Sequence, residues 1–165
     1  MKAVEVEVCD AIVASIDAMD LGEAKVVRRT WGDLSDDLGD TELRTLTIDI
    51  SPWMSLPDLD AEQLLQYEQL WDVFVRKNLG QNEQQIGTGA IIRDEIDRLA
   101  RISQDIFENF MPSNNAVLTT ENGLIATYDP QTTRRIQMLD RKQLKNERRF
   151  LAWWRIGFNT SKAAE

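Results

Sequence analysis

The sequence contains no histidine and a single cysteine, Cys9. Histidine is the commonest general base, the usual partner that activates a nucleophile and the commonest zinc ligand, so its absence removes three routes to catalysis. One cysteine can form neither an intrachain disulfide nor a cysteine metal cage. No pair of acids lies at a recognisable catalytic spacing, so a carboxylate-based enzyme ranks last. We therefore expect a protein that is not an enzyme and carries no cofactor.

Metal-loop and membrane signatures are missing as well. The acidic stretch 33–40 resembles a calcium loop, but Arg44 stands at the twelfth position, where such a loop needs glutamate. No apolar run approaches the ~18 residues that would cross a membrane. The opening MKAVEVEVCD carries acids where a secretory signal needs an unbroken apolar segment. These absences predict no metal site, no membrane partner and synthesis in a reducing cytoplasm.

Length and composition fit one soluble globular domain. The chain has 165 residues, of which 42% are hydrophobic and 28% charged. We expect a single domain over 1–165, with 161–165 as a loose tail.

Charge is unevenly distributed along the chain, whose net charge is −9. Residues 1–133 contain 10 basic and 25 acidic side chains, whereas 134–149 contain seven basic and two acidic ones. Such a basic segment indicates nucleic-acid contact, contact between unlike patches on neighbouring subunits, or a solvated basic helix beside the acidic body of its own chain. The candidate subunit-interface residues are Arg134, Arg135, Arg141, Lys142 and Lys145.

Helical periodicity is present in two segments. Apolar residues spaced by threes and fours predict an amphipathic first helix, although the opening VEVEV also fits a short strand: Val4, Val8, Ile12, Ile16 and Met19. Gly22 is placed to stop this helix in the left-handed cap conformation. A longer stripe follows Thr88, its candidate N-cap, and ends before Pro112; it consists of Ile92, Ile96, Leu99, Ile102, Ile106 and Phe110. It predicts a helix of about 23 residues.

Period-two alternation predicts the strands. The richest stretch is 148–160, which we expect at or near the centre of the sheet with one buried face: Phe150, Ala152, Trp154, Ile156 and Phe158. Shorter strands are expected at 24–31, 42–50, 66–77 and 123–128, the second and third of them paired as an antiparallel hairpin. Asp129-Pro130 is expected to start one or two helical turns within 132–147. The predicted fold class is α+β, a mostly antiparallel sheet of about four strands with both helices packed on it.

A proline-rich connection, SPWMSLPDLD, follows the 42–50 strand. Proline lacks the N–H that a strand ladder uses, so Pro52 and Pro57 are expected to interrupt the pairing. Trp53, Met54 and Leu56 within it either fold back onto the core or form a contact loop for a partner protein.

The order of elements resembles that of the tail terminator (tail completion, head-tail joining) proteins of long-tailed bacteriophages. The resemblance lies in the first helix VCDAIVASIDAM, the strands LRTLTIDIS and LWDVFVRKN around a variable loop, the long helix IIRDEIDRLARISQDIFENF and the closing strand RRFLAWWRIGFN. It covers most of the chain. The proline-rich loop 51–64 and an extra segment around 113–130 depart from the family pattern.

The resemblance implies an α/β structural protein of the virion, located in the tail and neck. Members of the family form a hexameric ring that caps the tail tube, ends its polymerisation and presents a surface to the head-side connector. The implied partners are further copies of the chain, the tail tube protein and the connector (neck) protein, with the tail sheath protein as an additional candidate. DNA is implied only as passing cargo, and the family has no catalytic residues to carry over.

A ring is built from head-to-tail contacts in which two different patches of each subunit meet. We therefore expect the basic 134–149 segment to dock on acidic surface of the adjacent subunit. The alternative is a nucleic-acid-binding or regulatory protein that uses the same segment, with Trp153 and Trp154 as stacking groups. Against that alternative stand the net charge of −9 and the strand alternation, which buries Trp154.

Overall fold

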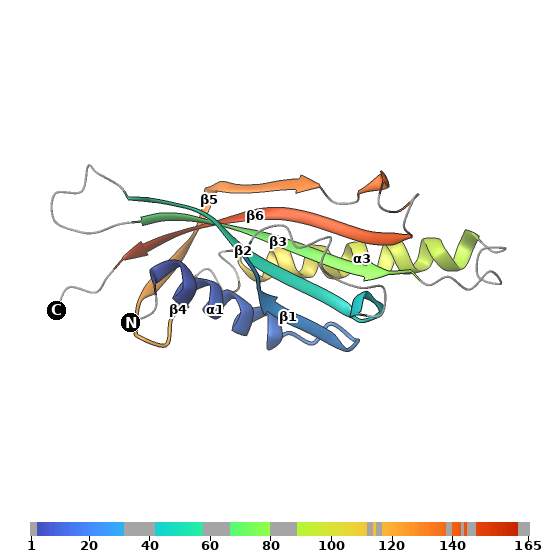
Figure 1. Ribbon diagram of the computed structural model, residues 1–165, viewed down its shortest axis with the longest axis horizontal. Helices are drawn as coiled ribbons and strands as arrows, with labels where there is room; N and C mark the ends of the chain where they lie inside the picture. Colours follow the sequence, from blue (N-terminus) through green and yellow to red (C-terminus); the bar gives the residue numbers. More distant parts are fainter. Residues whose placement is uncertain are drawn as a thin grey trace.

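The computed structural model describes residues 3–31, 42–57, 67–79, 89–111, 114, 117–137, 140–142, 144 and 148–161. Its elements in chain order are α1 (Val4–Asp17), β1 (Lys25–Arg29), the 3-10 helix η1 (Glu42–Arg44), β2 (Leu46–Pro57), β3 (Tyr67–Asn78), α3 (Gly89–Asn109), β4 (Val117–Thr119), β5 (Ile125–Gln137) and β6 (Arg149–Ser161). Figure 1 shows an elongated molecule in which α1 and α3 lie against a curled sheet. Thr88, the predicted N-cap of α3, and the acidic loop 33–40 lie outside the described residues.

The sheet has six strands in the order β1-β2-β3-β6-β5-β4. β1 pairs with β2 in parallel, and the other neighbouring strands pair antiparallel, which confirms the predicted β2–β3 pairing. The α+β class is confirmed, but the expectation of about four strands is only roughly right, because the sheet is larger and mixed. β4 has three residues, too few for alternation to be visible in the sequence.

β6 lies inside the sheet, between β3 and β5, as its sequence predicts. The side chains of its inward face are at most 1% exposed: Phe150, Ala152, Trp154, Ile156 and Phe158. Trp71, Phe110 and Tyr128 meet the ring of Phe158 edge-on, at centroid distances of 5.7, 5.9 and 6.2 Å. Edge-to-face packing of this kind adds to the area that the rings bury, so the closing strand joins the end of α3 to the neighbouring strands β3 and β5.

Both α-helices pack on the same face of the sheet. Their buried residues join the strands in one apolar cluster: Val8, Cys9, Ile12 and Ile16 of α1, and Leu99, Ile102, Ile106 and Phe110 of α3. The first segment is therefore a helix and not a strand. Gly22 has the predicted left-handed conformation, with φ 74°, but α1 already ends at Asp17. Gly22 instead closes a turn by donating its N–H to Asp20 Oδ1 at 2.9 Å.

α1 contacts both of the outermost strands, because the sheet curls. Asp10 accepts a hydrogen bond from Arg29 Nη1 of β1 at 2.7 Å. Glu7 accepts one from Thr120 Oγ1, directly after β4, at 3.2 Å. In Figure 1 the helix accordingly lies between the labels of β1 and β4. This position creates the pocket described below.

The proline-rich connection is not a break in the sheet, so that prediction was wrong. β2 continues through Pro52 to Pro57 and stays paired with β3, with one irregularity between Pro52 and Met54. The Ile50 carbonyl accepts the Thr30 N–H at 2.8 Å, so it points away from β3. Strand residues alternate in direction, so the Pro52 nitrogen also points away from β3, where β1 has already ended. A proline there removes no ladder bond.

The helix start predicted at Asp129-Pro130 was also wrong, because both residues lie within β5. Asp129 pairs with Gly157 and Arg134 with Arg155, so β5 carries a wide bulge between them. Asp129 organises this bulge, since Oδ1 accepts the Gln131 N–H at 2.9 Å and Oδ2 accepts the Thr132 hydroxyl at 3.0 Å. Aspartate followed by proline favours such a turn as readily as a helix start.

The bulge of β5 folds over Gly157 of β6. The Gly157 N–H donates to Thr133 Oγ1 at 3.1 Å. A Cβ at position 157 would overlap the hydroxyl of Thr132 and lie 2.9 Å from its Cβ. Glycine is therefore required at this position by close approach, not by backbone conformation.

Candidate functional site

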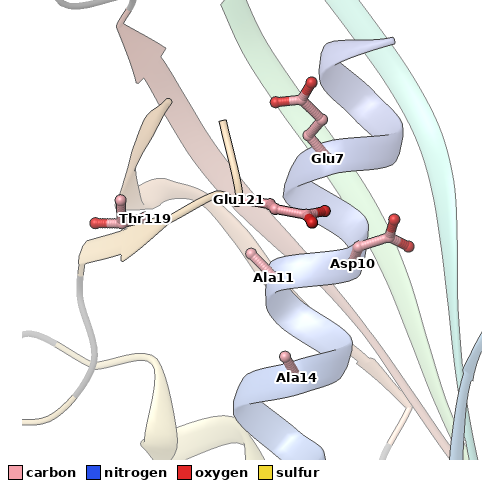
Figure 2. A pocket seen from close by; sticks show the side chains of 6 residues that line it. All are labelled: Glu7, Asp10, Ala11, Ala14, Thr119 and Glu121. Carbon is pink, nitrogen blue, oxygen red and sulfur yellow. The ribbon is translucent and has the colours of Figure 1, made fainter. Parts of the chain in front are cut away.

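A pocket of about 240 Å³ lies between α1 and the β4–β5 turn. Its lining consists of Glu7, Asp10, Ala11, Ala14, Thr119 and Glu121, which we call the acidic pocket. Figure 2 shows Glu121 extending from the strand side toward α1, with Ala11 and Ala14 on the facing side of the helix. The exposed lining of the pocket is therefore mainly apolar, with carboxylates beside it.

Glu7 is fixed in place by neutral donors. Its side chain is 9% exposed and accepts hydrogen bonds from Thr120 Oγ1 at 3.2 Å and Asn122 Nδ2 at 2.6 Å. Thr120 Oγ1 in turn accepts the Leu124 N–H at 3.0 Å. These bonds join α1 to the turn after β4 and add no positive charge. Asp10, by contrast, is paired with Arg29 at 2.7 Å.

The acidic pocket leaves no recognisable pattern in the sequence. Glu7 and Asp10 look like the polar face of an amphipathic helix, and Glu121 looks like part of a polar connection. Only the curl of the sheet brings residues more than 100 positions apart together. The one sequence feature in common is an excess of acids before residue 134, which is too diffuse to locate a site.

The predicted basic interface residues divide between two elements. Arg134 and Arg135 lie in β5, while Arg141 and Lys142 lie in a short helical turn that Asp140 caps by accepting the Lys142 N–H at 2.8 Å. Within the predicted segment 132–147, residues 132–137 are therefore strand, whereas Arg141 and Lys142 are helical; Lys145 lies outside the described residues.

Three of these basic side chains are exposed. They are Arg134, Arg141 and Lys142, which we call the basic end. Within the described part of the chain, no ion pair involves any of them. In Figure 1, β5 begins beside β4 and follows β6 to its other end, so Arg134 and the acidic pocket lie toward opposite ends of this strand.

Trp53, Met54 and Leu56 are strand residues, not members of a loop. Their backbone belongs to β2, opposite Leu70 and Glu68 of β3. Their side chains lie outside the described part, so the choice between core packing and partner contact stays a prediction.

The sheet face without helices carries buried ion pairs that the sequence analysis did not identify. Asp49 is 1% exposed and pairs with Arg76, itself 3% exposed, and with Arg28 Nε at 2.5 Å. Asp72 pairs with Arg155 at 2.7 Å on the same face. Alternation placed these residues opposite the core-facing positions, but the pairs themselves depend on strand register.

The two tryptophans proposed for base stacking are engaged within the protein. Trp154 is 1% exposed, and Trp153 stacks on Phe74 at 5.5 Å with an interplanar angle of 19°. Neither ring is available as an open platform of the kind that binds single-stranded nucleic acid.

The described ranges offer neither a metal-binding cluster nor a reactive thiol. No group of three or more His, Cys, Asp or Glu side chains there is arranged to hold a metal ion. Burial raises the pKa of the Cys9 thiol to about 12, so this thiol stays protonated at neutral pH. No helix in the described part is long and apolar enough to span a membrane.

No protein-family model matches the chain. A search of curated proteins finds no significant match either.

Proposed function

We propose that this protein is a structural subunit of a bacteriophage tail, located where the tail meets the neck. In this proposal, copies of the chain form a hexameric ring that caps the tail tube, ends tube polymerisation and joins the tube to the head-side connector. It is not an enzyme, and DNA passes it only as cargo. The proposal begins from the resemblance in the order of elements.

The structural observation that supports assembly is the separation of unlike charge along one strand. The acidic pocket lies at one end of β5 and the basic end at the other. Two complementary patches at different places on a subunit favour heterologous contacts, which close into rings or continue as filaments. Complementary charge also selects the correct partner patch over like-charged ones.

The first test is to measure mass by light scattering across a concentration range and to image the same sample by negative stain. We expect hexamers with a central hole. Added to polymerising tail tube protein, the chain should shorten the tubes and appear at one tube end. An unrelated acidic protein of similar net charge serves as control. A chain that stays monomeric and leaves tube length unchanged contradicts the proposal.

The second candidate function is nucleic-acid binding through the basic end, favoured by the exposed side chains of Arg134, Arg141 and Lys142. It predicts DNA affinity that falls steeply with salt, because each phosphate contact releases counterions. Titration of duplex and single-stranded DNA at low and high salt decides between the two. Tight, salt-sensitive binding would favour this second function.

A further inference from the structure

We infer that the acidic pocket of one subunit binds the basic end of a second copy of the same chain, with Glu121 as the carboxylate that receives an arginine or lysine. This inference rests on the proposed function, because it names the contact through which ring subunits would join. It adds to the proposed function by naming the residues on both sides of the contact.

The pocket has the right size and lining for one long cationic side chain. Its volume of about 240 Å³ corresponds to roughly eight water molecules at ~30 Å³ each. Ala11 and Ala14 offer an apolar wall for the methylene stem of the incoming side chain. Glu121 and Glu7 offer oxygen acceptors for its charged head, which forms its strongest hydrogen bonds with carboxylates.

The acceptors are held in place before any partner arrives. The turn that carries Glu121 is tied to α1 by the bonds from Thr120 and Asn122 to Glu7. A contact with a pre-organised site loses less side-chain entropy on binding.

The basic end supplies the complement from another copy. Arg134, Arg141 and Lys142 are exposed. Ile125 pairs with Ser161 and Arg134 with Arg155, so β5 separates the two positions by about 20 Å at ~3.3 Å per residue. One chain therefore presents its two patches to two different neighbours. A net charge of −9 disfavours contact between like surfaces, so this is the pairing that charge selects.

The contact can be tested by reversing the charge in the acidic pocket, reversing it in the basic end, and then combining both changes in one chain. Glu121→Lys alone should raise the subunit dissociation constant at least about tenfold, because like charges then face each other. The double variant Arg134→Glu/Arg141→Glu should have the same effect. Combining all three changes in one chain should restore assembly to within about threefold of the original, as expected of directly interacting sites.

Matched controls lie on the exposed side of α3. Asp105→Lys and Arg101→Glu change the net charge in the same sense at exposed positions away from the pocket, and both should assemble normally. Thermal unfolding of every variant separates lost contact from lost folding.

The outcomes separate the two proposals. Rings that persist in Glu121→Lys, or a combined variant that is not rescued, overturn this inference and leave the ring intact. A closed dimer that responds to the reversals and is rescued supports the contact and overturns the ring. A chain that is monomeric under all conditions, tube ends included, overturns both.

Discussion

The two faces of the sheet are both buried at their centre, but one face consists of apolar side chains and the other of polar and charged ones. On β2, Ile48 and Ile50 face the helices with no exposed area, while the alternate positions Thr47 and Asp49 are 3% and 1% exposed. The helix-covered face is a continuous apolar cluster, whereas the other face is held by ion pairs.

The two faces should therefore differ in how much stability a single substitution costs. An apolar cluster depends on summed volume and tolerates substitutions that conserve it. A buried ion pair depends on each partner, because removing one leaves the other charged and desolvated. Arg76 depends on this pairing especially, since among the described residues its buried Nε has no hydrogen-bond partner. Substitutions at neighbouring residues of one strand, which point to opposite faces, test this difference.

The largest effect is expected at Asp49. Asp49→Asn keeps the shape but removes the charge opposite Arg76, and should lower the free energy of unfolding by about 3–5 kcal/mol. Ile48→Val, one residue away on the other face, should cost only about 0.5–1.5 kcal/mol. Urea unfolding monitored by tryptophan fluorescence measures both.

A double variant sharpens this result. Asp49→Leu/Arg76→Leu removes both charges and should recover most of the loss, because apolar replacements of a buried pair are often neutral or stabilising. Arg28 is 36% exposed and can then turn to solvent. Equal costs for Asp49→Asn and Ile48→Val would show that the ion pairs do not distinguish the two faces.

The second-largest loss of stability is expected at Gly157, where the β5 bulge covers the face of the sheet without helices. Gly157→Ala places a Cβ against Thr132 and should cost about 1–3 kcal/mol, as for other overpacked sites. Asn159→Ala, an exposed position on the same strand and face, should stay within ~0.5 kcal/mol. Adding Thr132→Gly to Gly157→Ala should relieve part of the cost; no relief would locate the strain elsewhere.

The sequence predicted the elements whose pattern is local. β6, α1 and α3 were recognised because each repeats its apolar residues at a fixed period over many positions. The continuation of β2 through Pro52 was missed because it depends on the side to which the proline nitrogen points. That direction follows from the register of β2 between β1 and β3, and the proline is tolerated because the pairing with β1 ends at Ile50, which no local pattern encodes. The β5 bulge was missed because Asp129-Pro130 suits a helix start and a turn equally well.

Of the two charged surfaces, the basic end could be predicted from the sequence and the acidic pocket could not. The basic end follows from a run of basic residues close together in sequence, so its charge could be recognised directly. The acidic pocket joins α1 to a turn near residue 121, and the Asp49–Arg76 pair depends on the register of β2 and β3. Contacts of this kind exist only once the chain has folded.

The smallest loss of stability is expected for the partly exposed ion pairs of Glu95, which lie at the edge of the helix-covered face. Glu95 of α3 accepts hydrogen bonds from Arg98 at 2.6 and 3.0 Å, and Lys77 of β3 lies 3.3 Å away. The Arg98 hydrogen bond, followed by the charge of Lys77, lowers the pKa of Glu95. A carboxylate whose pKa is lower in the folded protein adds stability above its ordinary pKa and loses it as the pH falls through the lowered value.

Glu95→Gln should therefore destabilise the protein at neutral pH by less than ~1 kcal/mol, because the pair is partly exposed and screened. The difference from the original chain should vanish under acid conditions, where Glu95 itself is protonated. Urea unfolding at a series of pH values measures the difference, with Asp94→Asn at the neighbouring exposed position as control. A difference that does not change with pH would mean that Glu95 acts through packing, and that marginal ion pairs contribute no charge-dependent stability to either face.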